Sequence, residues 1–262
     1  MSHRARFGSS LLLLLLTVST AHAGDELYLR WDNCIGDGGV YNRTFACDTN
    51  LGVETLVGSF RLDQTFERMS YIQGYLEIAS IDLNPPRWWL FPYFSNDPVC
   101  RPFSALTASS VPPASSTSCF DGWAGHAIAS AAPRSQGSAR ISVIAALPAP
   151  STFTAPAGQE IYAFTVSISH ARTVGLGSCP GCTTPVCIAF GHAGLGGPDT
   201  IHPWIVGSAT PNNGSNVTWQ TGAVATTTGT CGPNGPCGTD VICQSETPAR
   251  GHTWGSIKSL YR

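Results

Sequence analysis

Residues 160–170, EIYAFTVSISH, decide the fold class because large apolar side chains alternate along them with small or polar ones. One face of the stretch carries Tyr162, Phe164, Val166 and Ile168, and the other carries Ala163, Thr165, Ser167 and Ser169. An alternation with a period of two places successive side chains on opposite faces of a β-strand. The stretch therefore predicts a strand that turns one face towards an apolar core.

The same alternation recurs between clusters of Gly, Pro, Asn and Ser, at residues 27–31, 55–62 and 139–147. Further strand candidates are residues 75–83, 87–91, 185–190 and 216–219, and the segments that read as loops are 107–118 and 207–216. Helical periodicity is nearly absent. This pattern predicts an all-β fold, an antiparallel β-sandwich or jelly roll with disulfide-stapled loops.

The first 23 residues predict export. They combine a basic start, an apolar run from Leu11 to Leu16 and the small-residue cleavage site Ala21-His22-Ala23, the pattern of a secretory signal peptide. We therefore expect a signal peptide at 1–23, a single β-sandwich domain at 24–252 and a short helical or extended tail at 253–262. An uncleaved anchor is an alternative, although the apolar run is far shorter than the roughly 20 residues of a spanning helix. Two smaller domains are another alternative.

Charge and composition argue against several classes of function. Loss of Arg4 and Arg6 with the signal peptide would reduce the 14 basic residues to 12, against 16 acidic ones. Because phosphate recognition normally shows clustered Lys and Arg, we expect no nucleic-acid partner. Lys258 is the only lysine, which excludes P-loop, Schiff-base and Ser-Lys chemistry from the rest of the chain.

All ten cysteines follow the predicted signal peptide, and an even number in an exported chain favours disulfides. They are Cys34, Cys47, Cys100, Cys119, Cys179, Cys182, Cys187, Cys231, Cys237 and Cys243. Proximity along the chain predicts that Cys34 pairs with Cys47, and Cys100 with Cys119. A bridge between the two triplets, 179–187 and 231–243, would tie the C-terminal segment to the sheet.

Cys179, Cys182 and Cys187 also raise the alternative of a zinc site. Its fourth ligand would be His170 or His192, but the second closely spaced ligand couple of structural zinc sites is missing. A redox pair needs C-x-x-C at the start of a helix, whereas the Pro-Gly turn here leads into a strand, and a haem attachment site needs His where Thr183 stands. We therefore predict a disulfide-stapled turn that leads into a strand, without a metal or another cofactor.

The N-terminal stretch 31–50, WDNCIGDGGVYNRTFACDTN, concentrates the oxygen ligands that calcium prefers. These side chains are Asp32, Asn33, Asp37, Asn42, Asp48 and Asn50. Their spacing does not match an EF-hand, and Asp-Gly-Gly and Asn are also the residues that tight turns require. A turn is the favoured interpretation, and calcium binding between Asp32 and Asp48 stays open.

The chain contains none of the catalytic signatures G-x-S-x-G, H-E-x-x-H and G-x-G-x-x-G, so no catalytic residue is predicted. Catalytic groups can nevertheless assemble from distant positions. The alternative function is therefore a secreted hydrolase of glycans or esters that uses Asp97 or Asp121 with His126.

Aromatic residues crowd the stretch 87–94, RWWLFPYF. Adjacent tryptophans on a strand face opposite sides, so either Trp88 or Trp89 could be exposed. Because an exposed Trp or Tyr can stack on a sugar or anchor a protein partner, Trp88, Trp89 and Tyr93 are the candidate ligand-binding residues. Burial of both tryptophans between sheet and loop is the favoured interpretation.

Three stretches together resemble a family of secreted bacterial proteins with no assigned activity: LRWDNCIGDGG…FACDTN…LVGSF, CPGCTTPVCIAF and TWGSIKSLYR. The resemblance covers most of the chain after residue 23. It implies export and a bacterial origin, and it transfers no catalytic or binding residue.

The last of these stretches, TWGSIKSLYR, also resembles the tails of other exported bacterial proteins, which suggests sorting or surface attachment. The alternative is that Trp254, Ile257 and Leu260 dock onto the sheet. We expect a non-enzymatic binding or structural protein at the bacterial cell surface, whose partner is a glycan or a cell-surface protein.

Overall fold

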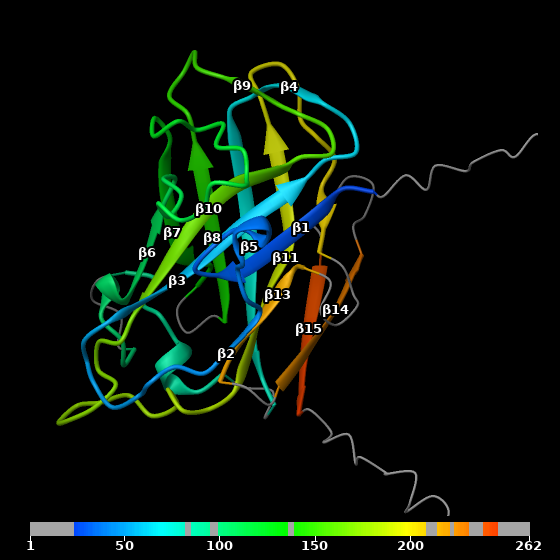
Figure 1. The fold of residues 1–262 in the computed structure, drawn as a ribbon. Coiled ribbons are helices and arrows are strands. Elements are labelled where there is room, and N and C mark those ends of the chain that lie inside the picture. Colours follow the sequence, from blue (N-terminus) through cyan, green and yellow to red (C-terminus); the bar gives the residue numbers. More distant parts are fainter. Residues whose placement is uncertain are drawn as a thin grey trace, which may run out of the picture.

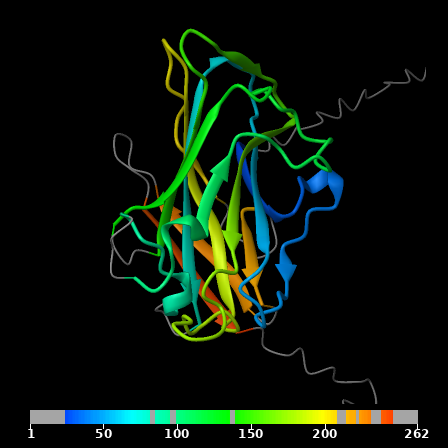
Figure 2. The same cartoon turned by 90° about the vertical axis from the view of Figure 1, so that its left-hand side faces the viewer.

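The computed structural model describes residues 24–81, 85–94, 99–135, 139–207, 214–220, 223–230 and 238–245. Two sheets lie face to face and enclose the core, as Figures 1 and 2 show. The predicted all-β sandwich with disulfide-stapled loops is confirmed. The predicted signal peptide, the tail at 253–262, Asp97, Cys231 and Cys237 lie outside the described residues.

The smaller sheet has four strands in the order β1 (Glu26–Trp31), β3 (Val53–Arg61), β10 (Glu160–Ser169) and β6 (Leu106–Ser109). The larger sheet runs β2 (Asn42–Arg43), β13 (Asn216–Trp219), β11 (Val186–Gly196), β5 (Tyr71–Ser80), β8 (Arg140–Ala146) and β7 (Ile128–Pro133), with β12 (Ile205–Val206) also paired to β11. The strands of both sheets are antiparallel except where β2 pairs with β13 in parallel. Two two-stranded sheets complete the fold, β4 (Phe66–Met69) with the distant β9 (Phe153–Ala155) and the hairpin of β14 (Ala223–Thr230) with β15 (Gly238–Ser245).

Strand β10 departs from strict alternation at one point. A β-bulge lies between Tyr162 and Phe164, so that Tyr162 pairs with Ser59 while Phe164 pairs with Gly58. An extra residue in one strand reverses the faces of the side chains that follow it. Phe164 therefore faces the core, where its ring lies 5.2 Å from that of Phe190 on β11, whereas Tyr162 lies on the opposite face of β10.

Four disulfides join segments that are 56 to 135 positions apart in the sequence. They are Cys34–Cys119, Cys47–Cys182, Cys100–Cys179 and Cys187–Cys243. The predicted pairs Cys34–Cys47 and Cys100–Cys119 are wrong, because the sandwich brings remote loops closer than sequence neighbours. The predicted bridge between the two triplets is confirmed by Cys187–Cys243, which ties β15 to β11.

Two local predictions also fail. Residues 87–91 form no strand, and a 3-10 helix, η2 (Arg87–Trp89), stands there instead. The predicted loop 107–118 begins with strand β6, which extends the smaller sheet by pairing with β10. The other 3-10 helices are η1 (Ile35–Asp37) and η3 (Phe103–Ala105). In the part of the chain that the structure describes, no helix has the length and apolar character to span a membrane.

Candidate functional site

Trp88 and Trp89 are fully buried, so neither can serve as an exposed stacking platform. Helix η2 turns both rings inward against Trp219 of β13, with ring centroids 5.0 and 5.1 Å away. Tyr93 is 38% exposed and meets the ring of Phe94 edge-on at 4.4 Å. Of the three predicted ligand-binding residues, only Tyr93 is open to solvent.

A buried arginine adds to this aromatic cluster. The guanidinium carbon of Arg101 lies 3.8 Å from the ring centre of Trp88, and the side chain donates hydrogen bonds to the backbone carbonyls of Trp88 and Ser169. Burial lowers the pKa of Arg101 to about 9. Carbonyl acceptors and the face of an indole stabilise the cation here, which indicates a structural role for the cluster.

The predicted turn after β1 uses the acidic residues of the N-terminal stretch. Asp37 accepts hydrogen bonds from the backbone N–H and the hydroxyl of Ser118 and from the hydroxyl of Thr117, and these bonds lower the pKa of the Asp37 carboxyl. Asp32 forms an ion pair with Arg43. These carboxylates therefore bind the protein's own donors.

One group of described residues lies close enough to share a metal ion, namely Cys34, Asp37 and Cys119. Cys34 and Cys119 form a disulfide, however, and a disulfide offers no thiolate ligand. Cys179, Cys182 and Cys187, the candidates for zinc, are likewise each bound to a different remote cysteine. The cysteines of both groups are thus used in covalent bonds.

The residues predicted for the alternative hydrolase do not form a described catalytic group. Asp121 accepts hydrogen bonds from the backbone N–H groups of Trp123 and Ala124, at 3.0 and 3.2 Å, and so stabilises a turn. His126 lies on the exposed part of the segment that follows.

An aromatic surface that sequence analysis missed lies on the outer face of the larger sheet, the face turned away from the smaller sheet. Strand β12 pairs His192 with Val206 and Ala193 with Ile205, so Trp204, the residue before β12, continues this register opposite Gly194. A Cβ atom on Gly194 would lie 3.2 Å from the six-membered ring of Trp204. The indole therefore rests directly on the backbone of β11.

Two rings of the neighbouring strands border this indole. The ring of His192 lies 5.5 Å from that of Trp204, and the ring of Tyr75 on β5 lies 6.2 Å away. Tyr75 and His192 are stacked at 4.4 Å, and the hydroxyl of Tyr75 accepts a hydrogen bond from the amide of Gln73 at 2.7 Å. We call Gln73, Tyr75, His192 and Trp204 the outer-face cluster.

Basic side chains surround the buried imidazole of the outer-face cluster. Burial lowers the pKa of His192 to about 4, and the positive charges of Arg140 and Arg134 lower it further. Arg134 lies over the ring of Tyr75 at 5.2 Å, and Arg140 forms an ion pair with Glu77. His192 is consequently neutral at physiological pH, and the cluster presents aromatic rings beside exposed hydrogen-bonding groups.

Hairpin β14–β15 covers the other half of the same outer face. Cys187 of β11 faces away from the core and is bonded to Cys243 of β15, which fastens the hairpin to the sheet. Figure 2 shows the hairpin on the outside of the larger sheet, away from the smaller one. The sandwich thus carries a strand layer over one half of this face and the outer-face cluster on the other half.

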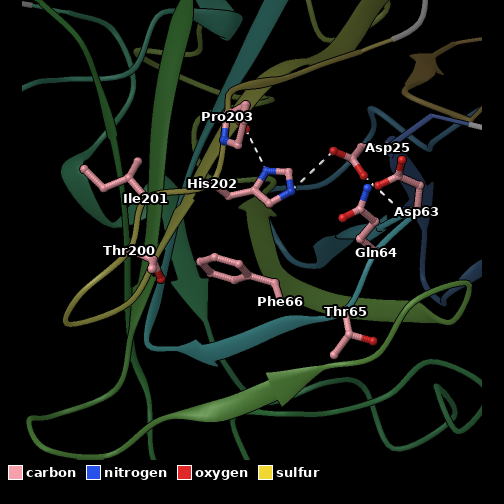
Figure 3. A pocket seen from close by; sticks show the side chains of 9 residues that line it. All are labelled: Asp25, Asp63, Gln64, Thr65, Phe66, Thr200, Ile201, His202 and Pro203. Atoms are coloured by element: carbon pink, nitrogen blue, oxygen red, sulfur yellow. Dashed lines mark hydrogen bonds and ion pairs between the residues drawn. The ribbon is translucent and has the colours of Figure 1, made fainter.

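A separate pocket of about 420 Å³ lies between the start of β1, the turn from β3 to β4 and the loop before β12. Its lining residues, shown in Figure 3, are Asp25, Asp63, Gln64, Thr65, Phe66, Thr200, Ile201, His202 and Pro203. His202 lies at its centre, with its ring edge-on to Phe66 at 5.4 Å. The pocket thus combines an aromatic ring with hydroxyl, amide and carboxylate groups.

Two contacts define the electrostatics of this pocket. His202 Nδ1 lies 2.8 Å from the carbonyl oxygen of Pro203, and its Nε2 lies 3.5 Å from Asp25 Oδ2. Burial raises the pKa of the Asp25 carboxyl. The hydrogen bond from the Asp63 N–H and the positive charge that His202 carries when protonated act in the opposite direction and lower that pKa. The pocket is therefore rich in acceptors, and none of the described residues that line it is Lys or Arg.

No family model and no curated protein matches the chain.

The missed residues had weak signals in the sequence. Trp204 stands alone in the loop-like stretch GGPDTIHPWIV, where no alternation marks it as part of a strand. Gly194, shortly after the predicted strand 185–190, could have indicated close approach of another group. Asp25 and His202 are 177 positions apart, and only the folded sheet brings them together.

Proposed function

We propose that this protein is exported to the bacterial cell surface and binds carbohydrate there without catalysing a reaction, through the outer-face cluster. The observation that carries the proposal is the exposure of one tryptophan. Among the six tryptophans of the described residues, Trp31, Trp88, Trp89, Trp123 and Trp219 are fully buried, whereas Trp204 is only partly buried.

The position of Trp204 supports sugar stacking. One side of the indole rests on the Gly194 backbone, and His192 and Tyr75 border it. We infer that the partly exposed side is the opposite ring face, which can accept the apolar face of a sugar ring. Arg134, Gln73 and the hydroxyl of Tyr75 offer hydrogen bonds at the edge of that surface to fix the sugar's orientation.

Export is supported by two observations. The first 23 residues have the pattern of a signal peptide. Four disulfides indicate an oxidising environment, because thiols in the cytosol are normally kept reduced. Together they favour an extracellular or cell-surface location.

A glycan array with the purified exported protein tests the proposal, followed by calorimetric titration of the best ligand. We expect Trp204→Ala to abolish detectable binding while the far-UV circular dichroism spectrum stays unchanged and thermal unfolding stays cooperative. Phe94→Ala is the matched control, because Phe94 is an exposed aromatic residue (60%) outside the outer-face cluster.

Two outcomes would contradict the proposal. If no glycan on the array binds the protein, the proposed carbohydrate-binding function is wrong. Glycan binding that survives Trp204→Ala but is lost in Tyr93→Ala or Phe94→Ala would move the site to the Tyr93–Phe94 pair.

A further inference from the structure

The pocket of Figure 3 has a fixed arrangement of hydrogen-bond acceptors that calls for a particular class of ligand. The carbonyl oxygen of Pro203 can only accept a hydrogen bond, so the Nδ1 atom of His202 must carry the hydrogen. In the neutral ring, Nε2 is then an acceptor. This atom is directed at Asp25, as the dashed line in Figure 3 shows.

The carboxylate of Asp25 is held in place from its other side. Its Oδ1 accepts the backbone N–H of Asp63 at 2.9 Å, which leaves Oδ2 directed at His202. Oδ2 and Nε2 are 3.5 Å apart, and both are acceptors when the carboxyl is ionised and the imidazole neutral. Two adjacent acceptors of this kind are stabilised by a donor that both can share.

The rest of the lining fits a donor that carries positive charge. Asp63 supplies a second carboxylate, and the ring of Phe66 offers a face for a cation. Gln64, Thr65 and Thr200 add amide and hydroxyl groups that can bind ring hydroxyls. The volume of about 420 Å³ lies in the lower part of the range of small-molecule sites, roughly 300–1,000 Å³.

We propose that this pocket binds an amino sugar, whose primary ammonium group donates hydrogen bonds to both Asp25 and His202. The ammonium supplies a donor that Oδ2 of Asp25 and Nε2 of His202 can share, and the sugar hydroxyls meet the amide and hydroxyl side chains. This site is distinct from the outer-face cluster and uses charge recognition, whereas the cluster uses ring stacking. The two sites are therefore separable by mutation.

The test compares glucosamine with glucose by calorimetric titration at pH 7, where the amine of glucosamine is largely protonated. We expect glucosamine to bind at least about 10-fold more tightly than glucose, since a hydrogen bond to a charged group is worth that factor or more. Asp25→Asn keeps the acceptor for the Asp63 N–H and removes the charge, so it should erase this preference. Asp48→Asn, at an exposed carboxylate outside the pocket, is the control and should preserve it.

A second measurement does not depend on how well the variants fold. In the wild-type protein, glucosamine should shift the NMR signals of the His202 ring, whereas glucose at the same concentration should not. Equal binding of the two sugars, an unchanged preference in Asp25→Asn, or an unshifted His202 ring would each overturn the proposal. A Trp204→Ala variant that loses polysaccharide binding but keeps glucosamine binding would separate this site from the proposed function.

Discussion

Phe164 and Trp204 each lie over a glycine of a neighbouring strand, but their surroundings differ. Phe164 of β10 lies over Gly58 of β3 in the core, where the larger sheet covers it through Phe190. Trp204 lies over Gly194 of β11 on the outer face and stays partly exposed. The local arrangement is the same in both pairs, so the layer that covers the ring decides whether it stabilises the fold or is free to bind.

The largest expected effect comes from removing the covered ring. Phe164→Ala should lower the free energy of unfolding by about 3–5 kcal/mol, because it leaves a cavity between the two sheets. Trp204→Ala should cost no more than about 2 kcal/mol, since the indole is already in partial contact with water. Urea denaturation of both variants measures the difference, and equal costs would show that the outer-face ring is as much a part of the core as Phe164.

The two glycines sharpen the same comparison. A Cβ atom at position 58 would lie 2.5 Å from the ring of Phe164, which has no room to move, so Gly58→Ala should cost about 1–3 kcal/mol. At position 194 the Cβ atom would lie 3.2 Å from Trp204, whose ring can shift outward, so Gly194→Ala should cost less than about 1 kcal/mol.

The two substitutions should affect glycan binding in the opposite order from stability. Gly194→Ala should weaken glycan binding because the indole no longer rests on the strand, whereas Gly58→Ala should leave binding by the folded fraction unchanged. Thermal denaturation and calorimetric titration of the two variants provide both values. Glycan affinity that is insensitive to Gly194→Ala would argue against the stacking role of Trp204.

The last comparison concerns pH and the residue beside Trp204. His192 has a pKa of about 4 in the folded protein and its ordinary value of 6.5 after unfolding. Between these values the unfolded chain binds a proton that the folded chain does not, so stability falls as the pH is lowered from 6.5 to about 4. We expect a loss of about 1–2 kcal/mol over this window, after allowance for solvent screening.

The variant His192→Gln checks the origin of that loss. Its unfolding free energy should vary less with pH between 6.5 and 4, because the side chain at position 192 no longer titrates. His126→Gln, at an exposed histidine, is the matched control and should keep the wild-type profile. Identical profiles for His192→Gln and the wild type would place the pH dependence elsewhere.

Much of the fold follows from local pattern. The alternation in 27–31, 55–62 and 139–147 predicts strands that the structure contains as β1, β3 and β8. The turn before residue 186 and the strand after it also follow from the Pro-Gly punctuation. These features depend on contacts between sequence neighbours, which a single sequence carries.

The candidate site was less predictable. The favoured interpretation, burial of both Trp88 and Trp89, is confirmed, but the predicted strand is wrong, because a 3-10 helix after two prolines directs both rings inward. The side chains that are exposed or line a pocket, Trp204 and His202, come from a stretch without periodicity. Whether an aromatic ring is covered depends on the second layer, about which spacing along one strand says nothing.

The sequence by itself determined the all-β class, the core face of the early strands and a disulfide-rich scaffold, because alternation and cysteine content are local or compositional properties. Only the tertiary structure decided the four disulfide pairings, the reversal of Tyr162 at its bulge and the meeting of Asp25 with His202. The physical reason is that these depend on which distant strands pair and how the two sheets stack. Packing over the whole chain selects that arrangement, and no stretch of sequence encodes it alone.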